Sequence, residues 1–302
     1  MARDGFINLL KPPGMTSHDA VAFVRRQLGL TRVGHLGTLD PAAAGVLPIS
    51  VGRATRLFDY AGKSEKTYRA ELALGLTTDT LDGEGKVTAT ADASELTETR
   101  VRELLAGMLG EREQVPPAFS AAQVDGKRLH ELARKGVRVT APPRRVVFSQ
   151  LDLVEFRPGR RARAMVDVVC SAGTYIRVLA DDLGRAAGCG AYLDFLLRTR
   201  SGRFVLTETV TLEELAAACE REEAEAHLLP PDWPLSELPR VDLVAPATAA
   251  FVVGTCVLTR IPAMWPVRVY GERGIFLGLG EATAAGQLRP RLILVTKEEL
   301  PQ

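Results

Sequence analysis

The sequence predicts an α+β fold: a mixed, mostly antiparallel central sheet flanked by helices, plus a small all-β domain at the C-terminal end. Strand-like runs are interleaved with segments of helical apolar spacing, without the regular rhythm of parallel β–α–β units. At roughly 150 residues per domain, 302 residues fit two domains. The proline-rich stretch PPDWPLSELP is the best boundary, so we expect domains at 1–238 and 239–302.

The first helix has the clearest local signals. Thr16 and Ser17 can cap it, its apolar residues recur at helical spacing, and Gly29 follows as a stop. Further helices are predicted at 54–63, 97–110, 126–136, 180–188 and 211–229. Strands or strand-like apolar runs are predicted at 6–12, 66–76, 146–156, 162–179, 191–204, 256–260, 267–270, 274–281 and 291–295. The polar segment 77–87 is predicted to be a loop.

Charge is segregated along the chain, although the net charge is only +1. Residues 1–70 carry +5 and residues 115–203 carry +8, whereas residues 71–114 carry −6 and residues 204–239 carry −8. A basic surface within a neutral protein is typical of a partner that is a polyanion. A solvated arginine-rich face would give the same pattern, so charge alone leaves nucleic-acid binding open.

Several functional classes are disfavoured. No uninterrupted apolar run approaches the ~20 residues that span a bilayer, and MARDGFINLLKPPG is interrupted too early for a secretory signal. We therefore expect a cytoplasmic protein that does not associate with membranes. The four cysteines form no CxxC pair and have no histidine at ligand spacing, so we expect no metal site. No phosphate-binding glycine loop precedes a helix, so we expect no nucleotide cofactor.

The stretch GHLGTLDPAAAGVLPI places one carboxylate, Asp40, between a glycine-rich turn and a proline. An aspartate in such a turn often accepts hydrogen bonds from nearby backbone N–H groups. However, the glycines also let the backbone approach a ligand closely, and flanking arginines favour an ionised nucleophile or base. His35, five residues upstream, is either a turn histidine or a ring that stacks on a nucleobase.

Two further segments contain candidate functional residues. Tyr68 lies in the expected strand 66–76, where a tyrosine commonly packs against the core. Tyr175 and Arg177 lie in CSAGTYIRVLADD, and an arginine inside an apolar strand is costly unless it meets an anion. We propose Asp40 as that anion, while the two aspartates of the following ADD remain alternatives.

Long segments of the chain follow one another in the order and spacing of a known family. They are GFINLLKPPGMTSHDAV, GHLGTLDPAAAGVLPISVGRATR, KTYRAELALGLTTDTLDGEG, QVPPAFSA, CSAGTYIRVLADDLG and LLRTRSGRF. These segments resemble the motifs of the TruB family of bacterial tRNA pseudouridine-55 synthases, nearly end to end. GIFLGLGEATAAGQLRP resembles the end of a PUA domain, a small β module that helps to hold RNA.

The resemblance implies the pseudouridine synthase fold and isomerisation of the T-arm uridine at position 55 of tRNA, without a cofactor. The bond from the sugar to N1 breaks, the uracil rotates, and C5 then bonds to the sugar. Asp40 falls on the family's nucleophile, Tyr68 on its base-stacking tyrosine and Arg177 on the arginine paired with the aspartate. His35 matches a substrate-contacting histidine, and Tyr175 and Leu196 match the remaining wall of the uracil pocket.

The resemblance also implies partners. Residues 115–145 resemble the RNA-gripping insertion of the stand-alone bacterial type, so we expect tRNA as the partner, no guide RNA, and a monomer. A non-catalytic RNA-binding module and a guide-dependent subunit remain as other hypotheses. Four positions, where the family usually has Thr, Lys, Tyr and Arg, depart from its pattern: Ala44, Gln123, His130 and Leu197.

Overall fold

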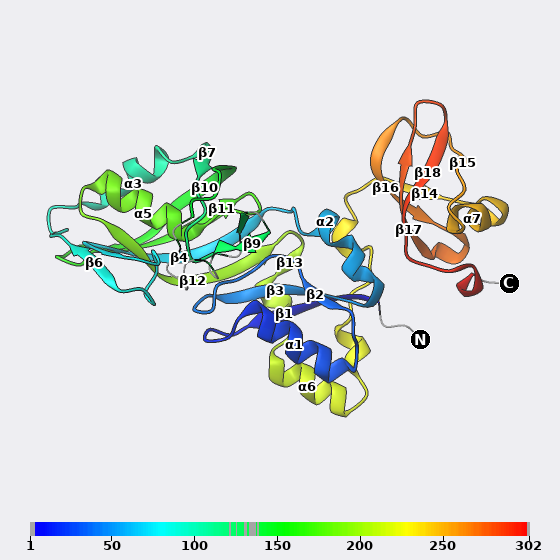
Figure 1. Cartoon of the computed structure of the whole chain (residues 1–302), viewed down its shortest axis with the longest axis horizontal. Helices are drawn as coiled ribbons and strands as arrows, with labels where there is room; N and C mark the ends of the chain where they lie inside the picture. The colour runs from blue at the N-terminus through cyan, green and yellow to red at the C-terminus, as the bar shows by residue number, and fades with distance from the viewer. Residues whose placement is uncertain are drawn as a thin grey trace.

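The computed structural model describes residues 4–120, 122–124, 126–129, 132, 137 and 139–300, and it confirms the α+β prediction (Figure 1). The central sheet is built from β1 (Gly5–Lys11), β2 (Val33–His35), β3 (Ala44–Val51), β4 (Lys66–Leu74), β7 (Gly110–Gln114), β10 (Arg144–Arg157), β11 (Arg163–Cys170), β12 (Ala191–Ser201) and β13 (Phe204–Val205). Within the described residues its order is β1–β3–β12–β4–β11–β10–β7, with β2 beside β3 and β13 beside β12. The sheet is mixed because β12 runs parallel to β3, whereas the other pairs are antiparallel.

In the described part of the chain, the helices that pack around this sheet include α1 (Ser17–Leu28), α3 (Glu98–Ala106), α5 (Ile176–Ala187) and α6 (Leu212–Glu220). α5 packs against β12, α3 against β10, and α1 lies beside α6 (Figure 1). α1 begins as predicted, since Thr16 and Asp19 form a reciprocal capping box. It ends at Gly29, whose φ of 64° is left-handed.

One hydrophobic core lies between the sheet and the helices α1, α3, α5 and α6. Buried and half-buried residues alternate along β11, and its Val166 and Val168 are fully buried. Leu179 and Leu183 of α5 belong to the same hydrophobic cluster. Because alternate residues of a strand share one face, this packing also determines which side chains of β4 and β12 face the same way.

Several predicted boundaries are wrong for local reasons. The helix predicted over 54–63 is replaced by a 3₁₀ segment, η1 (Gly52–Leu57), followed by a short α2 (Phe58–Ala61). No side chain caps the start of either element. The predicted loop 77–87 instead contributes to a hairpin of β5 (Leu76–Thr78) and β6 (Val87–Thr90). α3 ends at Ala106, four residues before the predicted end, since Gly110 begins β7.

The strand predicted over 162–179 is also wrong, and this error concerns the site. β11 ends at Cys170, and Arg177 lies in the first turn of α5. A turn with Gly173 at φ 85° separates the two elements. The side-chain amide of Gln114 brackets Tyr175, since it accepts from the backbone N–H at 2.9 Å and donates to the carbonyl at 3.2 Å.

Part of the predicted insertion 115–145 can be described. β8 (Gln123–Val124) pairs with β9 (Lys127–Arg128), which replaces the beginning of the helix predicted at 126–136. Most of the remainder of that predicted helix, including His130, lies outside the described residues.

The C-terminal part is a five-stranded sheet with one helix, α7 (Ala245–Val252), packed against it. Its strands are β14 (Arg240–Asp242), β15 (Val257–Leu258), β16 (Met264–Tyr270), β17 (Phe276–Ala282) and β18 (Gln287–Ile293). The order is β14–β16–β17–β18–β15, in which β14 is parallel to β16. The boundary at residue 238 stays a prediction.

The two parts share a hydrophobic cluster. Leu279 and Leu292 of the C-terminal sheet pack in one cluster with Phe6 and Leu57 of the N-terminal part. Tyr60 and Trp265 meet edge to face across the same interface, with ring centroids 5.5 Å apart. Arg53 pairs at 2.6 Å with both Asp4 and Glu299, which ties the two ends of the described chain to η1. The C-terminal sheet is therefore packed onto the N-terminal part.

Candidate active site

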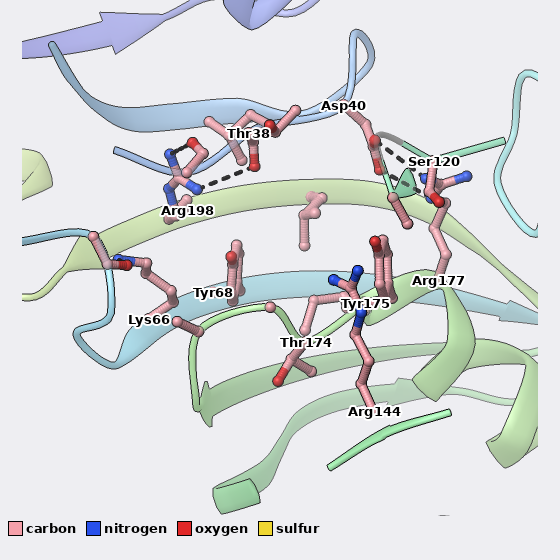
Figure 2. A pocket seen from close by; sticks show the side chains of 18 of the residues that line it. Thr38, Asp40, Lys66, Tyr68, Ser120, Arg144, Thr174, Tyr175, Arg177 and Arg198 are labelled. Carbon is pink, nitrogen blue, oxygen red and sulfur yellow. Dashed lines mark hydrogen bonds and ion pairs between the residues drawn. The ribbon is translucent and has the colours of Figure 1, made fainter. Parts of the chain in front are cut away.

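A cavity of about 540 Å³ is lined by five of the six residues singled out from the sequence: Asp40, Tyr68, Tyr175, Arg177 and Leu196. Its walls come from the loop before β3, one face of β4 and β12, α2, and the turn before α5 (Figure 2). The fold thus brings residues that are 137 positions apart in the sequence into contact at this cavity, as the Asp40–Arg177 hydrogen bond shows.

The loop that carries Asp40 is held on both sides. Gly37 has a φ of 105°, which side chains with a Cβ rarely adopt. The Ser17 hydroxyl, at the start of α1, donates to the carbonyl of Leu39 at 2.9 Å and accepts from its N–H at 2.8 Å. The fully buried Lys11 Nζ donates to the carbonyl of Pro41 at 3.2 Å. Asp40 is therefore positioned from β1 and α1.

Arg177 pairs with Asp40, as we proposed from the sequence. Its Nε lies 2.9 Å from Asp40 Oδ2, and its Nη2 donates to Oδ1 at 3.2 Å. Two backbone carbonyls accept further hydrogen bonds from the same guanidinium, which is only 4% exposed. Asp181, one of the alternatives, pairs with Arg185 instead. The geometry resembles a bidentate clamp, which fixes the orientation of the carboxylate.

A second carboxylate approaches the same arginine. Asp82 Oδ2, in the turn between β5 and β6, lies 3.5 Å from Arg177 Nη1, and its side chain is 13% exposed. The Thr80 hydroxyl and the backbone N–H of Glu84 donate to the other oxygen of Asp82. Asp82 was not singled out from the sequence, although it lies in the quoted segment KTYRAELALGLTTDTLDGEG, because nothing in a polar loop pattern shows which side chain reaches a distant arginine.

Burial raises the pKa of the Asp40 carboxyl above its ordinary value, and the nearby Arg177 opposes that rise only in part. The neighbouring Asp82 carboxylate raises the pKa of Asp40 further. Although 37% of the Asp40 side chain is accessible, it opens into a cavity rather than onto the outer surface. Desolvation therefore determines the direction of the pKa shift, while the ion pair with Arg177 still favours the ionised carboxylate.

Tyr68 and Leu196 form part of the cavity floor. β4 and β12 pair Tyr68 with Arg198 and Ala70 with Leu196, so these side chains share one face. Both Tyr68 and Leu196 are buried. Figure 2 shows the rings of Tyr68 and Tyr175 pointing from this floor toward the loop that carries Asp40. Tyr68 and Leu196 therefore give this floor an aromatic and an apolar contact surface.

His35 is the one predicted site residue outside the cavity lining. It ends β2, opposite Ile49 of β3, and is partly buried. Burial lowers the pKa of its imidazole, and the nearby Arg198 lowers it further. The structure therefore places a histidine biased toward the neutral form two residues before the Gly37 turn.

Other cavity residues were not singled out from the sequence. Lys66 and Arg198 lie on the same sheet face as Tyr68, and Arg144 reaches the cavity from the start of β10 (Figure 2). Arg198 was present in the quoted segment LLRTRSGRF, but nothing in the pattern showed that it is buried. Its Nε donates to the carbonyl of Val46 at 2.7 Å and its Nη2 to that of Gly37 at 3.1 Å.

Three of the four departures from the family pattern can be located. Ala44 and Leu197 are register partners where β3 and β12 run parallel, so the two apolar residues lie side by side. Gln123 is exposed and lines the cavity. His130 lies outside the described residues.

The described residues contain no cluster of three or more histidine, cysteine or carboxylate side chains that could hold a metal ion. None of the helices in the described part of the chain has the length and apolar character that crossing a bilayer requires.

Comparisons with known proteins show the family to which the chain belongs. Residues 25–176 match the N-terminal domain of TruB family pseudouridylate synthases. Residues 177–236 match the tRNA pseudouridylate synthase B C-terminal domain, and residues 239–294 match the C-terminal domain of pseudouridine synthase II TruB. The tRNA pseudouridine synthase B of Symbiobacterium thermophilum is 56% identical over 85% of this chain and 84% of its own length. That of Thiobacillus denitrificans is 45% identical over 98% of this chain and 97% of its own.

Solved structures show the same fold. The chain matches one from a crystal structure of a Cbf5–Nop10–Gar1 complex with a TM-score of 0.76 and 27% identity, over 99% of this chain and 88% of the other. A chain from a structure of an H/ACA RNP bound to a substrate RNA containing 2′-deoxyuridine matches with a TM-score of 0.74 and 25% identity. This match covers 98% of this chain and 87% of the other. With these matches and the Asp40–Arg177 cavity together, the chain belongs to the TruB family of pseudouridylate synthases, and it is an RNA-modifying isomerase.

Proposed function

We propose that this enzyme isomerises the T-arm uridine at position 55 of tRNA to pseudouridine, with Asp40 as the nucleophile. The observation that carries the proposal is the Asp40–Arg177 pair, which stands over a floor formed by Tyr68 and Leu196. The relatives' name, tRNA pseudouridine synthase B, supports tRNA as the substrate. The T-arm position rests on the motif resemblance in the sequence.

The cavity suits a single flipped base. A uridine inside a stacked arm cannot reach Asp40, so it must leave the stack at a cost of a few kcal/mol. Stacking on an aromatic side chain such as Tyr68 returns roughly 1–3 kcal/mol per base. Leu196 contributes apolar contact on the same face as Tyr68, and Tyr175 lines the same cavity. These contacts hold the ring while its attachment to the sugar changes.

Asp40 reacts in its ionised form, and Arg177 orients both of its oxygens. Because burial raises the pKa of Asp40, the carboxylate is also a stronger base and nucleophile than an exposed one. The raised pKa places the acid limit of activity above the range of an ordinary aspartate. The proposed reaction uses no cofactor.

The two basic blocks, residues 1–70 and 115–203, supply the positive charge that binds the RNA phosphates in this proposal. Arginine and lysine contacts to phosphates supply affinity without reading sequence, so the shape of the folded arm selects the substrate. We propose that the enzyme acts on tRNA as a monomer in the cytoplasm, without a guide RNA.

The test is pseudouridine formation in a synthetic T-arm stem-loop, with no metal, cofactor or guide RNA added. Wild type should form product, and Asp40→Asn should bind the stem-loop but form none. Near wild-type turnover by Asp40→Asn would overturn the nucleophile assignment. Binding without product from wild type would instead favour an RNA-binding module or a requirement for a guide.

A further inference from the structure

Two buried cations lie on the cavity floor beside Tyr68. In β4, Lys66 and Tyr68 are two residues apart and so share a face, and Arg198 of β12 is the register partner of Tyr68. Lys66 is 4% exposed and Arg198 is 1% exposed, yet both line the cavity. The strand register therefore places two positive charges next to the ring on which the uracil is proposed to stack.

Neither cation has an anionic partner within ion-pair distance in the described part of the chain. Lys66 Nζ donates to the hydroxyl of Ser201 at 2.9 Å, and to the Ser64 hydroxyl and the Gly62 carbonyl at 3.3 Å. The Arg198 guanidinium donates to backbone carbonyls at 2.7, 3.1 and 3.4 Å, and it also contacts the hydroxyl of Tyr68. These neutral acceptors occupy donors of both groups but supply no negative charge to offset the charge of either one.

The carboxylates of the cavity lie elsewhere. Asp40 stands with Arg177 on the opposite side of Tyr68 from Lys66 and Arg198 (Figure 2). Asp59 of α2, the other carboxylate among the described lining residues, is exposed at the rim. A buried charge without a partner is unfavourable unless an anion arrives. Lys66 and Arg198 thus form a buried cationic cluster that the Asp40–Arg177 pair does not use.

We propose that Lys66 and Arg198 form an electrostatic pocket that faces a carbonyl oxygen of the flipped uracil and stabilises negative charge on the ring during isomerisation. The proposal rests on the proposed function, because it requires uracil to occupy the cavity. It gives the base an orientation, with the sugar toward Asp40 and a carbonyl edge toward Lys66 and Arg198.

Negative charge develops on the uracil ring during the reaction, and a positively charged side chain nearby would stabilise it. When the N1–C1′ bond breaks, its electron pair remains with the uracil and spreads onto O2 and O4. Attack of a carboxylate on C6 would push electrons onto O4 in the same way. The charge disappears when C5 bonds to C1′, the C5 proton leaves and N1 takes up a proton. Fixed positive charge at the carbonyl edge therefore stabilises the charged ring more than the neutral substrate.

The electrostatics of Lys66 support this role. Burial, assisted by the nearby Arg198, lowers the pKa of Lys66 to about 7. A negative charge beside the amine would favour its protonated form, so charge on the uracil and charge on Lys66 reinforce each other. Lys66 thus responds to the reaction, whereas Arg198 is charged throughout.

The test is single-turnover isomerisation of T-arm stem-loops that carry uridine, 2-thiouridine or 4-thiouridine at the target position. Lys66→Met keeps the length of the side chain but removes its charge, and Lys66→Gln keeps a donor without charge. We expect both variants to bind the uridine stem-loop within about twofold of wild type, and to react about 30-fold more slowly. That loss is smaller than the roughly 100-fold that follows removal of a direct donor to an oxyanion.

Sulfur spreads negative charge more diffusely than oxygen and accepts hydrogen bonds weakly. For one of the two thio substrates, the wild-type to variant rate ratio should therefore fall from about 30 toward about 3, and that substrate identifies the oxygen facing Lys66. Equal ratios for all three substrates would overturn the proposal and assign Lys66 a structural role. Lys86→Met removes one exposed charge outside the cavity and should leave the rates unchanged. Absence of product from wild type would instead refute the proposed function.

Discussion

Removing the Arg177 guanidinium should move the acid limit of activity to higher pH. Arg177 approaches both oxygens of Asp40, at 2.9 and 3.2 Å, and its positive charge opposes the effect of burial on the pKa of that carboxyl. In Arg177→Gln this opposition is lost, while desolvation and the nearby Asp82 continue to raise the pKa of Asp40. The carboxylate must be ionised to react, so activity is lost as pH falls through this raised pKa.

The size of the shift follows from the geometry. An opposite charge within hydrogen-bond distance lowers the pKa of an aspartate by about 1–3 units. Because 37% of the Asp40 side chain is accessible, solvent screening favours the lower end of that range. We therefore expect the acid limb of kcat/KM to move up by about 1 pH unit in Arg177→Gln, and activity to recover in part at alkaline pH.

The assay is kcat/KM for the T-arm stem-loop across about pH 5 to 9, because this parameter reports groups of the free enzyme. Arg185→Gln is the matched control, since it removes an exposed arginine of the same helix that pairs with Asp181. Its acid limb should coincide with that of wild type. An acid limb that is the same in Arg177→Gln and wild type would refute the electrostatic coupling, even if the overall rate were lower.

Two further results are expected. Truncation after Leu238 should weaken stem-loop binding and lower Tm. The Tm falls because Leu279 and Leu292 leave a shared cluster and uncover Leu57. At about 1.5–3 kcal/mol for each buried leucine, the free energy of unfolding should fall by several kcal/mol. An unchanged Tm for the truncated chain would contradict a shared core. If about six basic side chains contact phosphates, stem-loop affinity should fall about 10³-fold between roughly 50 and 200 mM salt. A flat salt titration would refute phosphate contacts as the source of affinity.

The sequence by itself determined features that depend on a few neighbouring residues. The cap at Thr16 and the stop at Gly29 are satisfied within a turn of backbone, so the bounds of α1 could be predicted closely. The glycine-rich loop around Asp40 was recognisable for the same reason, since positive φ values and close approach are local requirements. Motif order and spacing indicated the family before any contact was known.

Tertiary structure decided which distant residues meet. The strand predicted across Arg177 has the right apolar pattern, but the Gln114 amide and the Gly173 turn end it and begin α5. Only that helix start brings Arg177 to Asp40, and only the β5–β6 turn brings Asp82 to both.

The burial of Lys66 and Arg198 in the cavity was also decided by tertiary structure. Neither KTY nor LLRTR reveals burial, because whether a strand position faces a cavity depends on register with its neighbours. The pairing of β4 with β12 places Arg198 opposite Tyr68 and buries Lys66 two residues away. Local sequence therefore indicated many of the elements and the candidate carboxylate Asp40, whereas strand register and helix packing gave that carboxylate its partner and its electrostatic surroundings.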